Sequence, residues 1–194
     1  VVIVGDCTPD ETPELLAKIP DPRIRFYNLP KPSKYPKDAK SRWFACGAPP
    51  RNYGLSMARG AWISELDDDD IYAPDHVESL LHLATSSNYE LVSGNYEAER
   101  YGKIILMDGK DENPRIGGIS TWLYRSYLKL FKYNVNSWRK KYNSVHDLER
   151  CFRMYQAGVR MGYLDKVVSF VLPRPGVPTV GLDAVEIITG EKLR

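Results

Sequence analysis

Hydrophobic and polar positions follow one another along this chain in short blocks that predict strands and helices in turn. The β-branched run over residues 1–5 predicts a buried strand, and residues 24–27 predict a second one. Between them, residues 8–18 predict a helix with Thr8 as its N-cap and Glu11 closing a capping box. Strand, helix and strand at this spacing predict a βαβ unit, and therefore an α/β fold with a mostly parallel sheet.

The same pattern continues to the end of the chain. It predicts helices over 51–59, 74–85 and 144–157, and strands over 61–66, 90–94, 100–107, 121–125 and 160–172. The strand over 100–107 is expected at an antiparallel edge, and residues 108–118 are expected to form a polar loop. In the helix over 74–85, the helical period gives a buried face of Val77, Leu80, Leu81 and Ala84. We expect one domain over 1–194, whose natural N-terminus lies upstream because Val1 opens inside a strand.

Two basic segments interrupt this pattern. Residues 29–50 hold five prolines and five lysines or arginines without a hydrophobic period, which predicts a long basic loop. This loop is either a solvated linker or a flap that meets an anionic ligand. Residues 138–141 combine a tryptophan with three cations, and form either a solvated face or a contact for an acceptor or a membrane.

Composition narrows the class of protein. The chain has 194 residues, 43% of them hydrophobic, which suffices for the core of one domain. A net charge of +2 gives no bulk attraction to nucleic acid. Three widely spaced cysteines argue against a disulfide framework or a zinc site, and favour a reducing, cytoplasmic compartment. No stretch is apolar enough to span a membrane, and no signal peptide is visible.

Four consecutive aspartates, Asp67–Asp70, close the apolar run over 61–66. Two carboxylates about 5 Å apart repel each other by roughly 3 kcal/mol at an effective dielectric constant near 20, so a cation, a polar ligand or water must relieve them. Carboxylates are the ligands that Mg²⁺ and Mn²⁺ prefer. If the chain stays extended, Asp67 and Asp69 point to the same side and can share one ion. The alternative is a solvated acidic turn before a helix.

Three segments in order carry a family resemblance. They are Val1-Val-Ile-Val-Gly-Asp6, then Arg51-Asn52 leading to Leu66-Asp-Asp-Asp-Asp70, and then Val145-His-Asp147-Leu-Glu-Arg150. Together they resemble family-2 glycosyltransferases of the GT-A type, which transfer sugars from nucleotide donors. The resemblance implies a Rossmann-like α/β sheet flanked by helices. Family members open with a further strand and helix, after which this chain begins.

The resemblance implies roles for individual residues. It places Asp6 against the nucleotide base, Arg51 and Asn52 beside the donor, Asp67 and Asp68 near the ribose and diphosphate, and Asp69, with Asp67, on a divalent metal, Mn²⁺ or Mg²⁺. Ligands in open α/β sheets bind outside the carboxyl ends of strands, so we expect one crevice to hold both Asp6 and Asp67.

Asp147 has two interpretations. Taken locally, Ser144-Val-His-Asp147 is a capping box in which Asp147 stabilises a helix by roughly 1 kcal/mol. In the family, the matching aspartate is the general base. The helical period buries Val145, Leu148, Phe152 and Tyr155, which leaves Asp147 facing a ligand. Both roles can coexist, because a position near a helix N-terminus keeps the carboxylate ionised.

The remaining candidates lie nearer the C-terminus. Gly117, Gly118 and Trp122 match the acceptor side of the family's site. His146 is a candidate substrate contact, and Arg174 a candidate diphosphate contact. No histidine follows Arg174, which leaves open the third protein ligand of the metal. His76 and His82 lie six residues apart in one helix and are interpreted as packing or surface residues.

These features predict an inverting, metal-dependent glycosyltransferase of the hexosyltransferase type. The donor would be a UDP-sugar, and the acceptor a carbohydrate or glycoconjugate in bacterial cell-surface polysaccharide synthesis. No nucleic-acid partner is expected, and the protein would act in the cytoplasm, with peripheral association at the inner membrane face as an open alternative. Two other functions stay open: a non-catalytic module that binds a metal or nucleotide sugar, and a nucleotidyltransferase.

Overall fold

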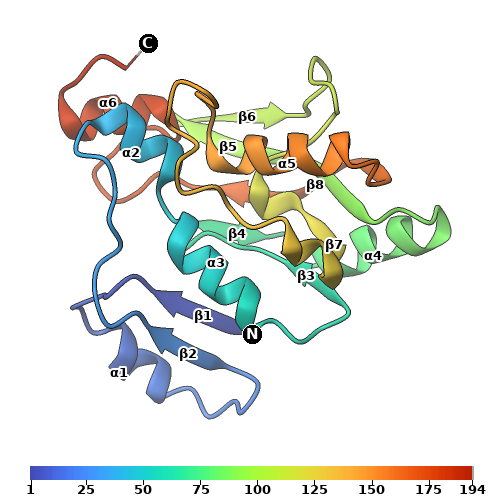
Figure 1. Cartoon of the computed structure of the whole chain (residues 1–194), viewed down its shortest axis with the longest axis horizontal. Helices are drawn as coiled ribbons and strands as arrows, with labels where there is room; N and C mark the ends of the chain where they lie inside the picture. The colour runs from blue at the N-terminus through green and yellow to red at the C-terminus, as the bar shows by residue number, and fades with distance from the viewer. Residues whose placement is uncertain (194) are drawn as a thin grey trace. The chain divides into compact units, whose positions relative to one another are not determined.

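The computed structural model describes residues 1–193 and divides the chain into two compact units (Figure 1). Unit 1 comprises Val1–Arg59 and Lys129–Arg150, and unit 2 comprises Gly60–Leu128 and Cys151–Arg194. Each unit is therefore built from two separate stretches of sequence. The expectation of one domain over 1–194 stays a prediction.

Unit 1 is built around a two-stranded parallel sheet. Its elements are β1 (Val2–Gly5), α1 (Thr12–Ala17), β2 (Arg25–Asn28), α2 (Ala39–Ala45) and α3 (Ala48–Met57). Strands β1 and β2 pair in parallel, with Val2 opposite Arg25 and Gly5 opposite Asn28. Helix α1 connects the two strands, and α3 packs against β1. The predicted βαβ unit is confirmed.

The predicted start of the first helix is wrong. Helix α1 begins at Thr12 with Glu11 in the capping position, four residues after Thr8. The Asn28 side chain holds the Thr8 backbone instead, since its Oδ1 accepts from Thr8 N and its Nδ2 donates to the Thr8 carbonyl, both at 2.9 Å. Two hydrogen bonds from the Asn28 side chain therefore hold Thr8 in place of the predicted capping box.

The predicted loop over 29–50 is also wrong in part, because α2 occupies Ala39–Ala45 and α3 begins at Ala48. Asp38 caps α2, since its Oδ1 accepts from Ser41 N at 2.8 Å. The only side chains that α2 buries fully are the small ones of Ala39 and Ala45. So short a helix with so little buried apolar surface leaves no hydrophobic period in the sequence.

Unit 2 carries a six-stranded sheet with helices and a short helical turn around it. Its elements are β3 (Trp62–Ser64), β4 (Asp70–Tyr72), α4 (His76–Ser86), β5 (Leu91–Arg100), β6 (Lys103–Met107), the 3₁₀ turn η1 (Ile119–Thr121), β7 (Leu123–Arg125), β8 (Met161–Val171) and α6 (Leu182–Thr189). The 3₁₀ turn η2 (Ser126–Leu130) and α5 (His146–Gln156) each run from one unit into the other.

The strands of unit 2 are ordered β3-β7-β5-β8-β4, and β6 also pairs with β5. The β5–β8 pair is parallel, and the other four pairs are antiparallel. The α/β class and the antiparallel edge strand β6 are confirmed, while the mixed sheet refines the mostly parallel one that the sequence suggests. Strand β6 follows β5 through the turn at residues 101–102, and a connection this short allows only antiparallel pairing.

Helix α4 covers the sheet of unit 2. Leu80 and Ala84 pack with Val92, Leu123 and Val168 in one buried cluster. The prediction is right for Leu80 and Ala84 but wrong for Val77, whose exposed fraction is 49%. The buried positions recur every four residues, and the third of them is His76 rather than an apolar residue. The hydrophobic period could not indicate His76, because a polar residue on the core face gives no apolar signal.

His76, which is buried, belongs to a polar cluster with the partly buried Ser64 and Tyr72, which we call the Ser64 cluster. Ser64 Oγ lies 2.9 Å from both Tyr72 Oη and His76 Nε2, and donates to the Trp122 carbonyl at 2.8 Å. The Tyr72 and His76 rings stack with centroids 3.7 Å apart. His76 Nδ1 lies 2.8 Å from the Val168 carbonyl oxygen, so this nitrogen carries the proton of the neutral ring. The cluster ties β3, β4 and α4 together.

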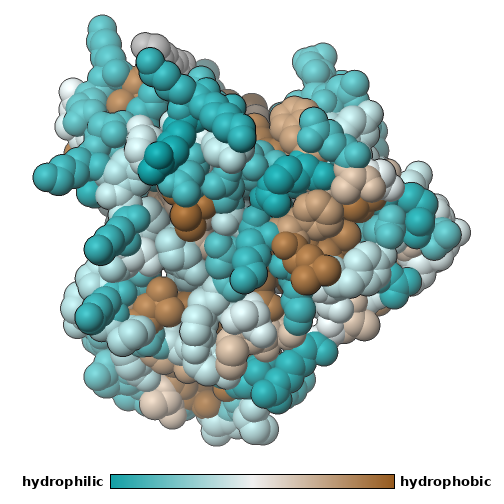
Figure 2. Space-filling view, viewed as in Figure 1, coloured by the Kyte–Doolittle hydropathy of each residue, from teal (hydrophilic) through white to brown (hydrophobic). Residues whose placement is uncertain are grey.

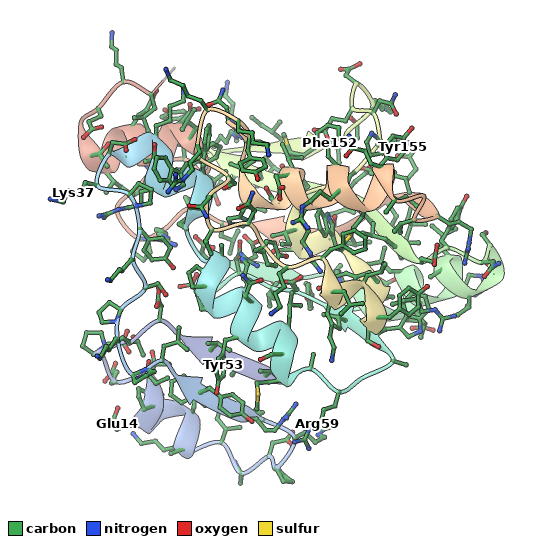
Figure 3. All side chains as sticks on the ribbon, viewed as in Figure 1. Glu14, Lys37, Tyr53, Arg59, Phe152 and Tyr155 are labelled. Atoms are coloured by element: carbon green, nitrogen blue, oxygen red, sulfur yellow. The ribbon has the colours of Figure 1, made fainter. Side chains whose placement is uncertain are left out.

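The predicted buried face of α5 is wrong. Phe152 and Tyr155 have exposed fractions of 47% and 48%, and both are labelled along α5 in Figure 3. Arg150 is fully buried instead. Its Nε donates to the Phe131 carbonyl at 2.6 Å, and its Nη1 donates to Tyr133 Oη at 2.8 Å. Because these partners bind two of the guanidinium nitrogens, α5 can turn a charged residue inward while aromatic residues lie outside.

No helix within residues 1–193 combines the length and the apolar character needed to cross a bilayer.

Leu80→Ala should destabilise the protein by about 2–5 kcal/mol, because it removes a fully buried side chain and leaves a cavity at the centre of the α4–sheet contact. The measurement is urea unfolding followed by circular dichroism. Val77→Ala, on the exposed side of the same helix, is the matched control and should change stability by less than about 1 kcal/mol. Equal losses in both variants would contradict the burial assigned to α4.

The unfolding free energy should fall as the pH drops from about 7 to 5, in part because burial lowers the pKa of His76 below its ordinary 6.5. The unfolded chain then binds the proton more readily than the folded one, so acid favours unfolding, by at most about 1.4 kcal/mol per pH unit for one proton. His76→Gln should flatten this slope, whereas His82→Gln, exposed on the same helix, should keep it. Urea unfolding at several pH values measures both, and an unchanged slope in His76→Gln would refute the assignment.

Candidate active site

The four aspartates lie in a turn between β3 and β4, which we call the acidic turn (Asp67–Asp70). Asp70 N donates to the Asp67 carbonyl at 3.2 Å, so the backbone reverses within the run. The argument that strand alternation aligns Asp67 with Asp69 therefore does not apply, because β3 ends at Ser64. The Ser64 cluster closes the base of this turn, since Ser64 precedes it and Tyr72 follows it.

The strand pairing of β3 brings Ser120 to the acidic turn. Ser64 pairs with Leu123 of β7, so the residues just before β7 lie beside the residues just after β3. Ser120 Oγ donates to the Asp70 carboxylate and accepts from Asp67 N at 3.4 Å. One buried hydroxyl thus holds both ends of the turn. The sequence offers no signal for Ser120, because its partners lie some 50 residues away.

The strand pairing of β4 brings Arg174 to the same turn. Asp70 pairs with Val171 of β8, and Leu172 N donates to the Asp69 carbonyl at 3.4 Å. Two residues later, Arg174 Nε donates to Asp69 Oδ2 at 3.0 Å, and its Nη2 lies 3.9 Å from Asp68 Oδ1. A guanidinium therefore relieves part of the repulsion within the acidic turn.

The carboxylates of the turn also act on their neighbours. Burial, with a smaller effect of the negative charges of Glu65, Asp67 and Asp70, raises the pKa of Tyr72 to about 12. A tyrosine that stays protonated at neutral pH keeps its hydroxyl hydrogen for the Ser64 cluster. The Tyr72 hydroxyl at the base of the turn therefore keeps its proton near neutral pH.

The donor set of the turn suits a hard cation that also binds phosphate. Within residues 1–193, no three His, Cys, Asp or Glu side chains are grouped as a complete metal site. Mg²⁺ in phosphate-transferring sites nevertheless needs only one or two carboxylates, because water and phosphate oxygens supply the other ligands. Asp69 and Asp67, both only partly exposed, meet that smaller requirement.

Trp122 occupies the core rather than a surface for an acceptor. Its exposed fraction is 1%, and its Nε1 donates to the Gly117 carbonyl at 2.8 Å. We therefore correct the predicted acceptor contact to a packing role that holds the loop before η1. At Gly117, a Cβ atom would lie 2.3 Å from the Gly94 carbonyl oxygen, so this close approach requires glycine. Gly118 is only partly buried and stays an acceptor-side candidate.

Asp6, in unit 1, follows β1 and holds the start of the long segment after β2. Its Oδ1 accepts from Ser33 N at 2.9 Å and from Ser33 Oγ at 2.6 Å, and its Oδ2 accepts from Tyr35 Oη at 2.7 Å. Burial, followed by the Asp6 carboxylate, raises the pKa of the Tyr35 phenol well above its usual range. The sequence gives no signal that Ser33 and Tyr35 bind Asp6. Tyr35 stands out only as the one aromatic residue within the lysine-rich residues 31–42.

Asn52, also in unit 1, uses its side-chain amide within the protein. Its Nδ2 donates to the Tyr133 carbonyl at 2.9 Å, and its Oδ1 accepts from Tyr133 N at 2.8 Å. The Arg51 guanidinium lies 5.8 Å from the centre of the Tyr133 ring. The motif Arg51-Asn52 therefore joins α3 to the second stretch of unit 1, and its predicted place beside the donor stays a prediction.

Asp147 is the second residue of α5, so the predicted capping box with Asp147 in the third position is wrong. Its Oδ1 accepts from Leu148 N at 2.8 Å, and the side chain is partly exposed. His146 is buried, with Nε2 only 2.6 Å from the Cys46 carbonyl oxygen, so its predicted contact with substrate is corrected to a structural one. Asp147 thus keeps a solvent-accessible carboxylate at a helix N-terminus.

The structure brings the predicted residues together in two groups. The acidic turn, Gly118 and Arg174 belong to unit 2, whereas Asp6, Arg51, Asn52 and Asp147 belong to unit 1. The expectation that one crevice holds Asp6 and Asp67 stays a prediction.

Curated proteins share part of this sequence. The chain is 34% identical over 110 residues to the succinoglycan biosynthesis protein ExoO of Rhizobium meliloti (strain 1021), a stretch that covers 57% of this chain and 26% of ExoO. It is 32% identical over 90 residues to the poly(ribitol-phosphate) beta-N-acetylglucosaminyltransferase TarP of Staphylococcus aureus (strain N315), covering 44% and 28% of the two chains. The chain thus spans about a quarter of the length of these relatives.

Solved structures share the fold. The structure superimposes on residues 1–349 of S. aureus TarS in complex with UDP-GlcNAc with a TM-score of 0.65 at 17% identity, over 92% of this chain and 50% of that one. The same TarS segment in complex with UDP gives a TM-score of 0.63 at 16% identity, over 90% and 51%. At such low identity the likeness establishes the fold alone.

The sequence model described as glycosyl transferase family 2 matches residues 47–160, a range that includes the acidic turn, Gly118 and Asp147. This match covers more than half of the chain, and it agrees with the α/β fold found in the structure. The chain belongs to glycosyl transferase family 2.

Proposed function

We propose that this chain carries the donor-binding and catalytic residues of an inverting glycosyltransferase that uses a UDP-sugar. The observation that carries the proposal is the acidic turn, held at its base by the Ser64 cluster, by Ser120 and by Arg174. Such an arrangement fixes several carboxylates at the end of a strand at an electrostatic cost, which a bound cation and diphosphate would offset. The complex of TarS with UDP-GlcNAc supports UDP as the nucleotide.

Each residue of the acidic turn would contact a different part of the donor or its cation. Asp69 and Asp67 would hold a divalent cation, Mn²⁺ or Mg²⁺, which when bound supplies Lewis-acid stabilisation of the departing diphosphate. Asp68, whose side chain is almost fully exposed, would face the ribose and diphosphate. Arg174 already lies against Asp69 and would turn its remaining donors towards the diphosphate. Asp6 would contact the nucleotide base, and Arg51 and Asn52 would lie beside the donor.

Asp147 would act as the general base. Its carboxylate would take the proton of the acceptor hydroxyl as that oxygen attacks the anomeric carbon from the face opposite the diphosphate, which inverts the configuration. The N-terminus of α5 favours the ionised carboxylate, which is the form that accepts a proton. Gly118 would border the acceptor.

The acceptor would be a growing polysaccharide or glycoconjugate. Both curated relatives support this class, since one is named for succinoglycan biosynthesis and the other for transfer to poly(ribitol phosphate). The protein would act in the cytoplasm, peripherally at the inner face of the membrane.

Thermal unfolding with UDP, GDP, dTDP and CMP, each with Mn²⁺ or with EDTA, tests the donor site. UDP with Mn²⁺ should stabilise the protein by about 2.7 kcal/mol at a hundred times its dissociation constant, and EDTA should remove most of this gain. Asp69→Asn should lose the part that depends on Mn²⁺, whereas Glu78→Gln, exposed on α4, should keep it. If no nucleotide shifts the unfolding temperature, the donor site is not here.

Asp147→Asn should lower kcat by about 10²–10⁴-fold while leaving the stabilisation by UDP unchanged, because it removes the base without touching the donor. The assay follows the release of UDP from UDP-GlcNAc in the presence of saccharide acceptors. Asp10→Asn, which alters an exposed carboxylate of the same unit, is the matched control and should keep full activity. Full activity in Asp147→Asn would exclude it as the base, and a non-catalytic module would show no UDP release in any variant.

A further inference from the structure

Charge is divided very unevenly between the two units. Unit 1 contains 16 lysines and arginines against 8 aspartates and glutamates, a formal net charge of +8. Unit 2 contains 11 against 17, a net charge of −6. The modest overall charge of +2 therefore conceals a strongly basic unit.

The cations of unit 1 concentrate in two segments that the structure joins. One is residues 31–42, which runs into α2 and exposes Lys31, Lys34, Lys37, Lys40 and Arg42. The other is residues 129–146, which contain five cations and no acidic residue. Figure 3 shows Lys37 projecting away from the chain ahead of α2, and in Figure 2 hydrophilic side chains gather where α2 lies in the same view.

Hydrogen bonds hold the two segments side by side. Ser137, fully buried, donates its hydroxyl to the Phe44 carbonyl at 2.9 Å. Ser144 N donates to the Ser137 carbonyl at 3.2 Å, which closes a loop over 137–144 against the end of α2. We call the combined surface of residues 31–42 and 135–142 the basic face.

The closed loop mixes cations with aromatic and apolar side chains. The Arg139 guanidinium lies 5.2 Å from the centre of the Trp138 ring, and Lys141 Nζ lies 5.5 Å from that of Tyr142. Val135 and Tyr142 have exposed fractions of 45% and 40%. The loop therefore presents positive charge and apolar surface together, without a carboxylate between them.

We infer that the basic face docks the protein on a membrane that contains anionic phospholipid. Juxtaposed lysines and arginines are attracted to the negative surface potential of such a membrane, and tyrosine and tryptophan prefer the interface between headgroups and acyl chains. The inference gives a surface to the peripheral membrane location in the proposed function, and the biological role of that surface rests on the proposed function. Membrane binding itself requires neither a bound donor nor sugar transfer.

A polyanionic polymer is the competing partner for such a surface. Polymer binding depends on the number of cations alone, since it is driven by neutralising phosphate or carboxylate groups. Val135 and Tyr142, exposed on the basic face, add nothing to that attraction, whereas both gain from burial at a bilayer interface. The apolar component thus favours the membrane.

Co-sedimentation with vesicles tests the inference on the whole chain. The unaltered protein should bind vesicles of phosphatidylcholine mixed with phosphatidylglycerol and should not bind phosphatidylcholine alone. Arg139→Gln/Lys140→Gln/Lys141→Gln should weaken binding about 100-fold, at about fivefold for each cation removed. Lys18→Gln/Arg59→Gln/Lys103→Gln removes the same charge from exposed positions outside the basic face and should bind as the unaltered protein does.

A second variant separates the membrane from a polyanion. Val135→Ser/Tyr142→Ser should weaken binding to the anionic vesicles and leave binding to inorganic polyphosphate unchanged. The inference is overturned if the unaltered protein binds polyphosphate but no vesicles, if it binds neither, or if both triple variants lose vesicle binding equally. Stabilisation by UDP, measured on each variant, reports folding and the donor site separately, so failure of the proposed function is distinguished from failure of the docking surface.

Discussion

The acidic turn depends on the Ser64 cluster beneath it. Four adjacent carboxylates repel one another, and a short turn that carries them would open unless its two ends were held. Ser64 and Tyr72 lie at those ends, and His76 locks both to the Val168 carbonyl on the facing strand β8. The rings of Tyr72 and His76 stack with their centroids 3.7 Å apart, which adds a packing contact to these hydrogen bonds. The position of the acidic turn therefore relies on a partly buried polar cluster.

The sheet of unit 2 supplies everything else that the turn needs. Pairing of β3 with β7 delivers Ser120, and pairing of β4 with β8 delivers Arg174. Both partners are distant in sequence from the turn, and each lies three residues from an end of its strand, Ser120 before β7 and Arg174 after β8. The register of an antiparallel pair and the residue at which a strand ends thus decide which side chains lie beside the turn. Under the proposed function, a divalent cation bound together with the donor's diphosphate would offset this cluster of negative charge.

Two errors of the sequence analysis, on the buried face of α5 and on the cap at Thr8, have the same cause. In each, a polar side chain binds a partner that is distant in the sequence. Arg150 is buried because the Phe131 carbonyl and the Tyr133 hydroxyl satisfy it, which reverses the face of α5 that the apolar pattern favours. Thr8 does not cap a helix because Asn28 binds its backbone. Hydrophobic periodicity assigns burial by residue type, and it cannot register a hydrogen bond across tens of residues.

The sequence by itself determined most of the strands and helices, although not α2, β4 or α6, and it also determined the βαβ start, the position of the Asp67–Asp70 run after a strand, and the family. Those features follow from local periodicity, turn chemistry and motif spacing, which are encoded within a few residues. Only the tertiary structure decided that the run is a closed turn, that Arg174 pairs with Asp69, that Asn52 and His146 bind backbone carbonyls of Tyr133 and Cys46, and that two basic segments lie together. The physical reason is that each of these depends on strand register and on hydrogen bonds between residues that only folding brings together.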